Sequence, residues 1–477
     1  MLFNSFEFLI FLPTVFLLYW FIFKSQKQQN FLIVVASYIF YGWWNYRFLA
    51  LIAFTTLYSY FSGIAIEQTD SKSKRRAISV SSIVINLLIL GVFKYYNFFV
   101  NNIEILLKEL FNYQLDSVTL DIILPVGISF YTFQALSYTI DVYRGEIRAS
   151  HNLIEFGAYI SFFPQLVAGP IERATNLLPQ FQRPREFRYA TAVDGARQML
   201  WGFVKKLVVA DNCAVIVNNN WDNISSFSGL SIILLGVLFS FQIYCDFSGY
   251  SDIAIGCARL FGFNLMRNFD YPYFSRNIPE FWRKWHISLM SWFRDYIYFP
   301  LGGSRCDKGK AIRNVYLVWG VSGLWHGANW TFVCWGLYHA TFLAIYRYFG
   351  IKSKSDKTIE IIPSVKDVIK IVFTFFFVVM GWIIFRAESM ENVFEIFSSI
   401  VTNPFIDTNN INGMWCLLLG LAILIIEWIQ KDKQHALQFP HNRIFKRRLV
   451  RWSVYYTLLL VILEYMGASQ TFIYFQF

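Results

Sequence analysis

Charged side chains are scarce in this sequence of 477 residues: Asp, Glu, Lys and Arg together make up 15% of it, whereas 56% is hydrophobic. Several soluble domains of this combined length would need more charge to cover their surfaces. The shortage excludes a string of soluble domains and predicts a protein embedded in a lipid bilayer.

Domain boundaries are missing as well. The sequence has no internal repeat, no low-complexity segment and no linker rich in Pro, Gly or Ser that is long enough to separate domains. We therefore expect one continuous membrane domain over residues 1–477.

Paired cysteines are also lacking. The six Cys residues show no metal-ligand spacing, and most of them lie in apolar stretches. They are interpreted as small buried hydrophobic residues, so the sequence predicts neither a disulfide framework nor a metal site.

What the sequence does contain is long apolar runs. A spanning helix needs ~20 mostly apolar residues because the hydrocarbon layer is ~30 Å thick. The runs that approach this length are residues 8–23, 49–66, 80–93, 122–143, 371–385, 411–426 and 452–462. They predict an all-α, polytopic membrane protein. No basic stretch precedes the first run and no small-residue cleavage site follows it, so we expect a retained helix and not a secretion signal.

The formal net charge of +11 is compatible with nucleic-acid binding, but the positions of the charges argue against it. The basic residues gather in particular loops, while alternate loops are neutral or acidic. The basic groups are Lys24 and Lys27; Lys72, Lys74, Arg75 and Arg76; Arg183, Arg185 and Arg188; Arg305, Lys308, Lys310 and Arg313; and Arg443, Lys446, Arg447 and Arg448. The positive-inside rule predicts that these loops are cytoplasmic and that both termini lie outside.

Residues 157–171 form an apolar, uncharged segment that is interrupted by Pro164, Gly169 and Pro170. Proline removes a backbone donor, and broken backbone survives at membrane depth only where protein or a water-filled cavity satisfies it. We expect either a re-entrant segment that lines a cavity or a kinked spanning helix.

Residues 272–313 carry too many charges for a spanning helix, because bulky apolar side chains alternate with Arg283, Lys284, His286 and Arg294. An amphipathic helix at the cytoplasmic interface, with Trp and Tyr at headgroup level, is the better prediction. The same helix would serve equally well as a cover over a cavity that faces the cytosol.

A histidine follows the basic cluster that ends at Arg313. Residues 314–324 cover ~17 Å as a helix, which places His326 near the middle of the hydrocarbon layer if the helix starts at the cytoplasmic face. An ionisable side chain at that depth marks a pathway or a reaction centre, and His is well suited to take and return a proton. Acyl transfer from a thioester to a hydroxyl needs one such base. The alternative is a neutral His326 that is hydrogen-bonded between helices.

Two further histidines are less decisive. On a continuous helix His339 would lie ~20 Å beyond His326, so we interpret it as a packing residue unless the helix breaks between them. His286 has Arg283 and Lys284 beside it, and these cations could meet the phosphates of an acyl donor. A solvated His286 at headgroup level is equally compatible with the sequence.

Two carboxylates, Asp246 and Asp252, lie in apolar surroundings. They could orient a histidine, hold a helix break or coordinate an ion. His151, His435 and His441 lie in polar stretches and are interpreted as incidental.

Five strings of residues, in the same order, resemble the membrane-bound O-acyltransferase superfamily, and in particular its bacterial branch that acetylates alginate, peptidoglycan and related glycans. They are LPVGISFYTFQALSYTIDVYRG, FFPQLVAGPIER, YCDFSGYSDIAIGCARLFGF, EFWRKWHISLMSWFRDYIYFPLGG and SGLWHGANWTFVCWGLYHA, and they cover residues 124–340.

The resemblance implies a helical bundle around a transmembrane tunnel, with re-entrant and interfacial helices, in the bacterial inner membrane. It implies that His326, in the WHG string, is the essential base and that His286 is also functional, although Lys284 stands where an arginine-like neighbour is common. Acetyl-CoA would be the donor substrate, with no bound cofactor, and Arg283, Lys284 and Arg294 would meet its phosphates.

The resemblance also implies an extracytoplasmic partner of the SGNH esterase type, which would complete the transfer to a polysaccharide. Relatives that transfer D-alanine to teichoic acid share the same strings, but the extra apolar runs after Phe385 favour the alginate-like type. Two other classes stay open: a proton-coupled transporter, for which neither inverted repeats nor paired broken helices are evident, and a noncatalytic scaffold for an extracytoplasmic enzyme.

Overall fold

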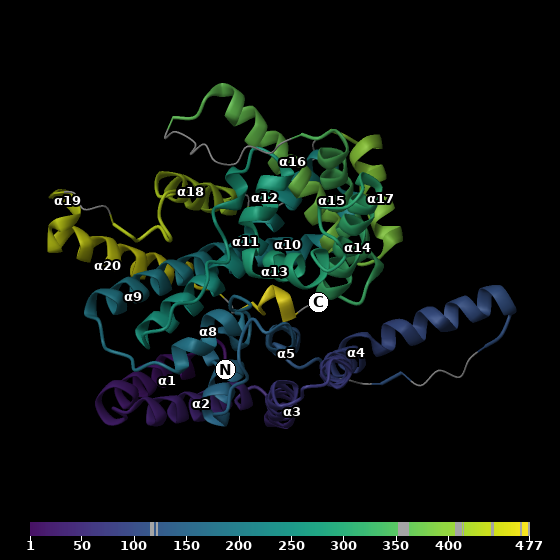
Figure 1. The fold of residues 1–477 in the computed structure, drawn as a ribbon. Helices are drawn as coiled ribbons and strands as arrows, with labels where there is room; N and C mark the ends of the chain where they lie inside the picture. Colours follow the sequence, from purple (N-terminus) through teal and green to yellow (C-terminus); the bar gives the residue numbers. More distant parts are fainter. Residues whose placement is uncertain are drawn as a thin grey trace. The chain divides into compact units, whose positions relative to one another are not determined.

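The computed structural model describes residues 1–114, 119–120, 123–351, 362–405, 413, 415–439, 443–467 and 470–475. Regular structure in these ranges is helical, without a β-strand, so the all-α prediction is confirmed (Figure 1). The first residues of the predicted runs at 122 and 411, and His441, lie outside the described residues.

The chain divides into two compact units, residues 1–192 with 258–265 and residues 193–257 with 266–477. Helices α9 (Tyr189–Phe203) and α11 (Gly229–Leu260) run through the division and contribute to both units. That residues 1–477 act as one membrane domain stays a prediction.

The first unit consists of helices that pack on one another, both between neighbours in sequence, such as α3 on α4, and between distant segments, such as α2 on α6. They are α1 (Phe6–Leu17), the π-helix η1 (Leu18–Ile22), α2 (Gln26–Gly42), η2 (Tyr46–Phe48), α3 (Leu49–Glu67), α4 (Lys72–Phe111), α5 (Ile128–Arg144), α6 (Leu153–Ser161), α7 (Phe163–Leu166) and α8 (Ala174–Phe181).

The second unit contains α11 and the helices that hold the predicted site. They are η3 (Val204–Ala210), α10 (Asp211–Trp221), η4 (Ile224–Ser226), η5 (Pro272–Phe274), α12 (Ile278–Lys284), α13 (Ile287–Phe293), η6 (Arg294–Tyr298), α14 (Lys308–His326), α15 (Trp330–Tyr348), α16 (Val365–Arg386), α17 (Met390–Thr402), α18 (Trp415–Ile429), α19 (Arg443–Lys446), α20 (Arg448–Tyr465) and η8 (Ile473–Phe475).

Among the residues that the structure describes, four helices are long and apolar enough to cross a membrane: Tyr46–Glu67, Lys72–Phe111, Gly229–Leu260 and Val365–Arg386. The runs Phe6–Ile22 and Trp415–Ile429 are shorter apolar helices. These elements coincide with the apolar runs of the sequence, except that α11, which contains the Asp-bearing string, adds a span that the sequence analysis did not count. The chain is therefore a polytopic membrane protein.

The apolar segment with Pro164 is broken, as its prolines predict. Helix α6 ends at Ser161, and α7 starts at Phe163 after a non-helical Phe162. The Phe163 N–H, which the break releases from helical bonding, donates to Ser37 Oγ at 3.0 Å. Protein satisfies this donor, which is the condition for broken backbone inside a membrane domain. That the segment lines a cavity stays a prediction.

The segment 272–313 differs from the single amphipathic helix that we expected. It contains two short helices, α12 and α13, that meet at His286, whose φ of 45° is left-handed. A continuous helix cannot accommodate that backbone. Both helices are largely buried, with Trp282, Trp285 and Trp292 in the interior.

In the second unit, two pairs of helices approach each other closely at glycines. Gly202 on α9 and Gly249 on α11 approach so closely that a Cβ on Gly202 would lie 2.5 Å from the Gly249 carbonyl oxygen. In the α14–α15 hairpin, a Cβ on Gly336 would collide with the Trp319 carbonyl oxygen. Since a larger residue has no space at these positions, glycine sets the distance between the helices.

Candidate functional site

His326 is the last residue of α14, immediately before the turn that leads into α15. His326 is buried, with only 5% of its surface exposed. The imidazole centroid lies 4.9 Å from the Trp325 ring, 5.0 Å from the Trp335 ring and 5.3 Å from the Phe385 ring. The predicted base is thus placed in an aromatic surrounding at a helix end.

His286 is 1% exposed and has a defined partner. Its Nδ1 lies 3.0 Å from Asn268 Oδ1. The Ser288 N–H and Oγ donate to the same oxygen at 3.3 and 2.9 Å, so this atom is an acceptor. Nδ1 must therefore carry hydrogen and donate to Asn268, which leaves Nε2 with the lone pair in the neutral ring.

Burial also keeps this ring uncharged. His286 lies outside the candidate spanning helices, and desolvation lowers its pKa to about 3. Neutral imidazole, with Nε2 as the acceptor, is the form present at neutral pH. The alternative of a solvated His286 at headgroup level is wrong.

Trp325 brings the two predicted catalytic histidines together. Its ring lies 6.2 Å from the His286 ring and 4.9 Å from the His326 ring, centroid to centroid. The two histidines are forty positions apart in the sequence. Their common neighbour supports the view that they belong to one site.

A helix break separates His339 from His326, because α14 ends at His326 and α15 begins at Trp330. This is the arrangement in which the sequence allows the two histidines to approach each other. Trp335 stands between them, 5.0 Å from His326 and 5.3 Å from His339. His339 is fully buried against Trp282 and Tyr338, and among the described residues neither ring nitrogen has a hydrogen-bond partner. This environment supports the packing interpretation.

The cations proposed to meet donor phosphates have differing environments. Lys284 Nζ pairs with Glu280 Oε1 at 3.1 Å, and Arg294 Nε pairs with Asp295 Oδ1 at 2.7 Å. Arg283 is exposed. To bind a phosphate, Lys284 and Arg294 would either keep these carboxylate partners and contact the phosphate as well, or release the carboxylates first.

The sequence analysis missed two buried lysines, Lys205 and Lys206, on the π-helical stretch η3. Lys205 Nζ lies 2.5 Å from Asp252 Oδ2. Lys206 Nζ lies 2.8 Å from Asp246 Oδ1 and 2.8 Å from Asp211 Oδ1. Both aspartates that the sequence left unassigned are therefore ion-paired to lysines, and neither belongs to a cluster of metal-binding side chains in the described part of the chain. Two consecutive Lys in the run VKKLVVA are the signal that could have revealed them.

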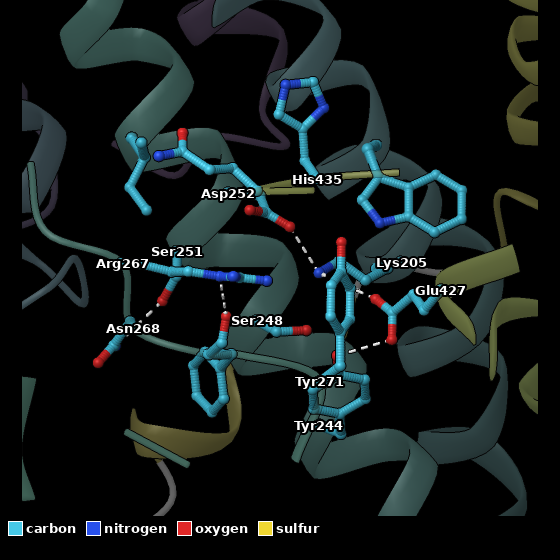
Figure 2. Close-up of a pocket in the computed structure, with 14 residues that line it drawn as sticks. Lys205, Tyr244, Ser248, Ser251, Asp252, Arg267, Asn268, Tyr271, Glu427 and His435 are labelled. Carbon is cyan, nitrogen blue, oxygen red and sulfur yellow. Dashed lines mark hydrogen bonds and ion pairs between the residues drawn. The ribbon is translucent and has the colours of Figure 1, made fainter. Parts of the chain in front are cut away.

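A narrow polar pocket adjoins the Lys205 pair, as Figure 2 shows. Glu427 Oε1 lies 3.7 Å from Lys205 Nζ, and the Tyr244 hydroxyl donates to Glu427 at 2.7 Å. Asn268, the partner of His286, donates to Ser251 Oγ at 3.2 Å on another wall of this pocket. The free volume is about 10 Å³, enough for one water molecule.

The remaining histidines are placed as follows. His151 is exposed and pairs with Glu67 at 2.7 Å. His435 is 1% exposed, lines the narrow pocket and pairs with Asp194 at 3.2 Å. Packing thus buries His435 despite its polar neighbours in sequence, and that it is incidental to function stays a prediction.

The apolar helices and the buried histidines together define the class of protein, which is a polytopic membrane protein with imidazoles inside the fold. Comparison with known families identifies it further. The model of MBOAT, the membrane-bound O-acyltransferase family, matches residues 144–385, a range that contains both His286 and His326. The chain belongs to this family and is an O-acyltransferase.

Named relatives are similar over most of their length. The probable alginate O-acetylase AlgI of Pseudomonas aeruginosa is 40% identical over 434 residues, 89% of this chain and 81% of that protein. The peptidoglycan O-acetyltransferase of Helicobacter pylori is 34% identical, over 84% of this chain and 80% of that protein. The teichoic acid D-alanyltransferase of Bacillus subtilis is 30% identical over 56% of this chain and 70% of that protein.

Proposed function

We propose that this enzyme transfers an acetyl group from acetyl-CoA in the cytosol to a hydroxyl on the extracytoplasmic side of the bacterial inner membrane, for O-acetylation of a polysaccharide. The observation that carries the proposal is the pair of buried histidines that both contact the Trp325 ring, in a chain similar to the alginate and peptidoglycan O-acetylating proteins over more than four fifths of its length.

In the proposed reaction His326 is the general base. Its imidazole takes the proton of the acceptor hydroxyl while the oxygen attacks the thioester carbonyl carbon. The carbon–sulfur bond breaks, the acetyl ester forms, and the thiolate of coenzyme A receives the proton. His286, with Nε2 as its acceptor nitrogen, is the second functional residue, and it would hold or exchange a proton at that atom.

Substrate access sets a condition on this mechanism. Because His326 is 5% exposed and ringed by aromatic side chains, the thioester and the hydroxyl must reach it through a passage between those rings. The proposed tunnel would supply that passage, with basic loops and donor on the cytoplasmic side and both termini outside.

The acceptor is proposed to be reached through a partner of the SGNH esterase type. This partner would pass the acetyl group to alginate, peptidoglycan or a similar glycan. Arg283, Lys284 and Arg294 are proposed to meet donor phosphates, Arg283 most directly because it is exposed.

The test is release of free coenzyme A thiol from acetyl-CoA by the purified chain in proteoliposomes that contain the partner. We expect His326→Ala to lower the rate by a factor of about 100 or more. His151→Gln is the matched control, since this histidine is exposed. Wild-type rates in the His326 variant would refute the mechanism.

D-alanyl transfer is the second candidate, and the similarity to the Bacillus subtilis teichoic acid D-alanyltransferase favours it. The same proteoliposomes, supplied with a D-alanyl carrier-protein thioester, would distinguish the two. Consumption of that thioester without consumption of acetyl-CoA would select the D-alanyl reaction. Full polymer acetylation in cells that carry only the His326→Ala chain would instead indicate a scaffold.

A further inference from the structure

A second pocket lies within the first unit, at the end of the first apolar helix. It has a volume of about 430 Å³ and is lined by Trp20 from η1, by the residues of the loop 184–188, and by Arg259 and Leu260 at the end of α11. None of these residues belongs to the histidine site described above.

The charge of the pocket is positive. Three arginines, Arg185, Arg188 and Arg259, line it against one carboxylate, that of Glu186. Arg185 is a structural cation, because it donates to Asn30 Oδ1 at 2.7 Å and to Gln29 Oε1 at 3.3 Å. Arg188 is exposed, and within the described residues it has neither an ion pair nor a hydrogen bond to a side chain. Its guanidinium is therefore the group best placed to receive an anion.

The aromatic wall of the pocket is rigidly held. Trp20 donates its indole N–H to the Leu260 carbonyl oxygen at 2.9 Å. The Phe187 ring packs 5.4 Å from Trp20 and 6.0 Å from Phe16. This wall does not depend on a ligand for its shape.

The helix that supplies Trp20 also presents apolar side chains outward. Leu17, Phe21 and Ile22 are each more than half exposed. Exposed Lys24 and Lys27 follow directly. A change from exposed apolar residues to lysines, with Trp at the junction, is the pattern of a helix end at the headgroup level of a bilayer.

We propose that this pocket binds the phosphate headgroup of an anionic phospholipid. Arg188 and Arg259 would receive the phosphate, Trp20 would contact the glycerol backbone, and the acyl chains would lie along the exposed apolar face of η1. Basic pockets beside spanning helices on the cytoplasmic side are suited to such headgroups. A phosphate ligand without acyl chains, such as coenzyme A, would make no use of the apolar face.

Native mass spectrometry of the full chain in detergent tests the proposal without any assay of acyl transfer. The probes are dioleoylphosphatidylglycerol and the zwitterionic dioleoylphosphatidylcholine. We expect preferential retention of the phosphatidylglycerol, and a fall of about fivefold for each arginine removed, so on the order of 25-fold in Arg188→Gln/Arg259→Gln. Arg183→Gln is the matched control, because Arg183 is an exposed arginine of the same loop that does not line the pocket.

Melting temperatures of all variants show whether each is folded. If the double variant unfolds, the single variant Arg188→Gln, which changes an exposed residue, still tests the proposal. Equal retention of the two lipids by the wild type, or unchanged phosphatidylglycerol retention in Arg188→Gln, would overturn the proposal. The proposal would also be overturned if Arg188→Gln lost coenzyme A binding but retained phosphatidylglycerol, because the pocket would then belong to the acyl donor. Failure of the acetyl-transfer proposal would leave this lipid measurement unaffected.

Discussion

Asn268 accepts a hydrogen bond from His286 Nδ1 over 3.0 Å, and the same Asn oxygen is held by the backbone and hydroxyl of Ser288. Asn268 itself is anchored because its side-chain amide donates to Ser251 on α11. The orientation of a proposed catalytic imidazole, and which of its nitrogens has the lone pair, thus depend on one amide side chain.

Asn268 is accordingly predicted to be a positioning residue. Asn268→Leu, of similar size but without an acceptor, should lower kcat by about 10- to 100-fold with a smaller change in KM. Asn268→Asp should recover part of the activity. A carboxylate facing Nδ1–H favours the imidazolium, so the acidic limb of the pH–rate profile should move to higher pH. Equal losses in both variants with no shift in the profile would indicate a merely structural role.

Stability should fall in mildly acidic solution because His286 is buried as the neutral ring. Its folded-state pKa of about 3 lies below the ordinary value of 6.5, so the unfolded chain binds a proton that the folded chain does not. The contribution is complete above pH 6.5 and decreases as the pH falls toward 3. At pH 5 the loss is about 2 kcal/mol. Melting temperatures of the wild type and His286→Gln should therefore converge between pH 7 and pH 5; parallel curves would contradict the prediction.

Trp325 is predicted to hold both histidines in place. Trp325→Ala removes the ring that contacts His286 and His326, so we expect a loss of about 3–5 kcal/mol of stability and a fall in kcat of tenfold or more. Trp325→Phe keeps an aromatic ring and should retain most of the activity. Thiol release and melting temperature, measured on the same preparations, separate the two effects. Full activity in Trp325→Ala would show that the shared contact is irrelevant to catalysis.

The ion pair between Lys205 and Asp252 should be costly to break from one side. Lys205→Met leaves the buried Glu427 carboxylate and the largely covered Asp252 carboxylate without their cation, at a cost of about 3–5 kcal/mol. The double variant Lys205→Met/Asp252→Asn should be more stable than Lys205→Met alone. A double-mutant cycle on melting temperature measures the coupling. Additive losses would mean that the pair contributes no interaction energy of its own.

Prediction from the local sequence succeeded where hydrogen bonding within one segment decides the secondary structure. The apolar runs around residues 49–66 and 371–385 are helices, and the prolines of residues 157–171 do break a helix. It failed at residues 272–313, where the charges suggested a surface helix. The backbone at His286 adopts a left-handed conformation because its side chain and the following N–H groups bond Asn268, eighteen positions earlier.

The sequence by itself determined that this protein is helical and embedded in a membrane, because residues in lipid must satisfy their backbone groups within a helix and ~20 apolar residues suffice to specify one. It also determined the family, through five short strings. Only the tertiary structure decided that His286 and His326 share Trp325, that Asp252 pairs with Lys205, and that His435 is buried. His286 lies 39 positions from Trp325, and Lys205 lies 47 positions from Asp252. Contacts over such separations depend on how helices pack, and no local pattern records which helix faces meet.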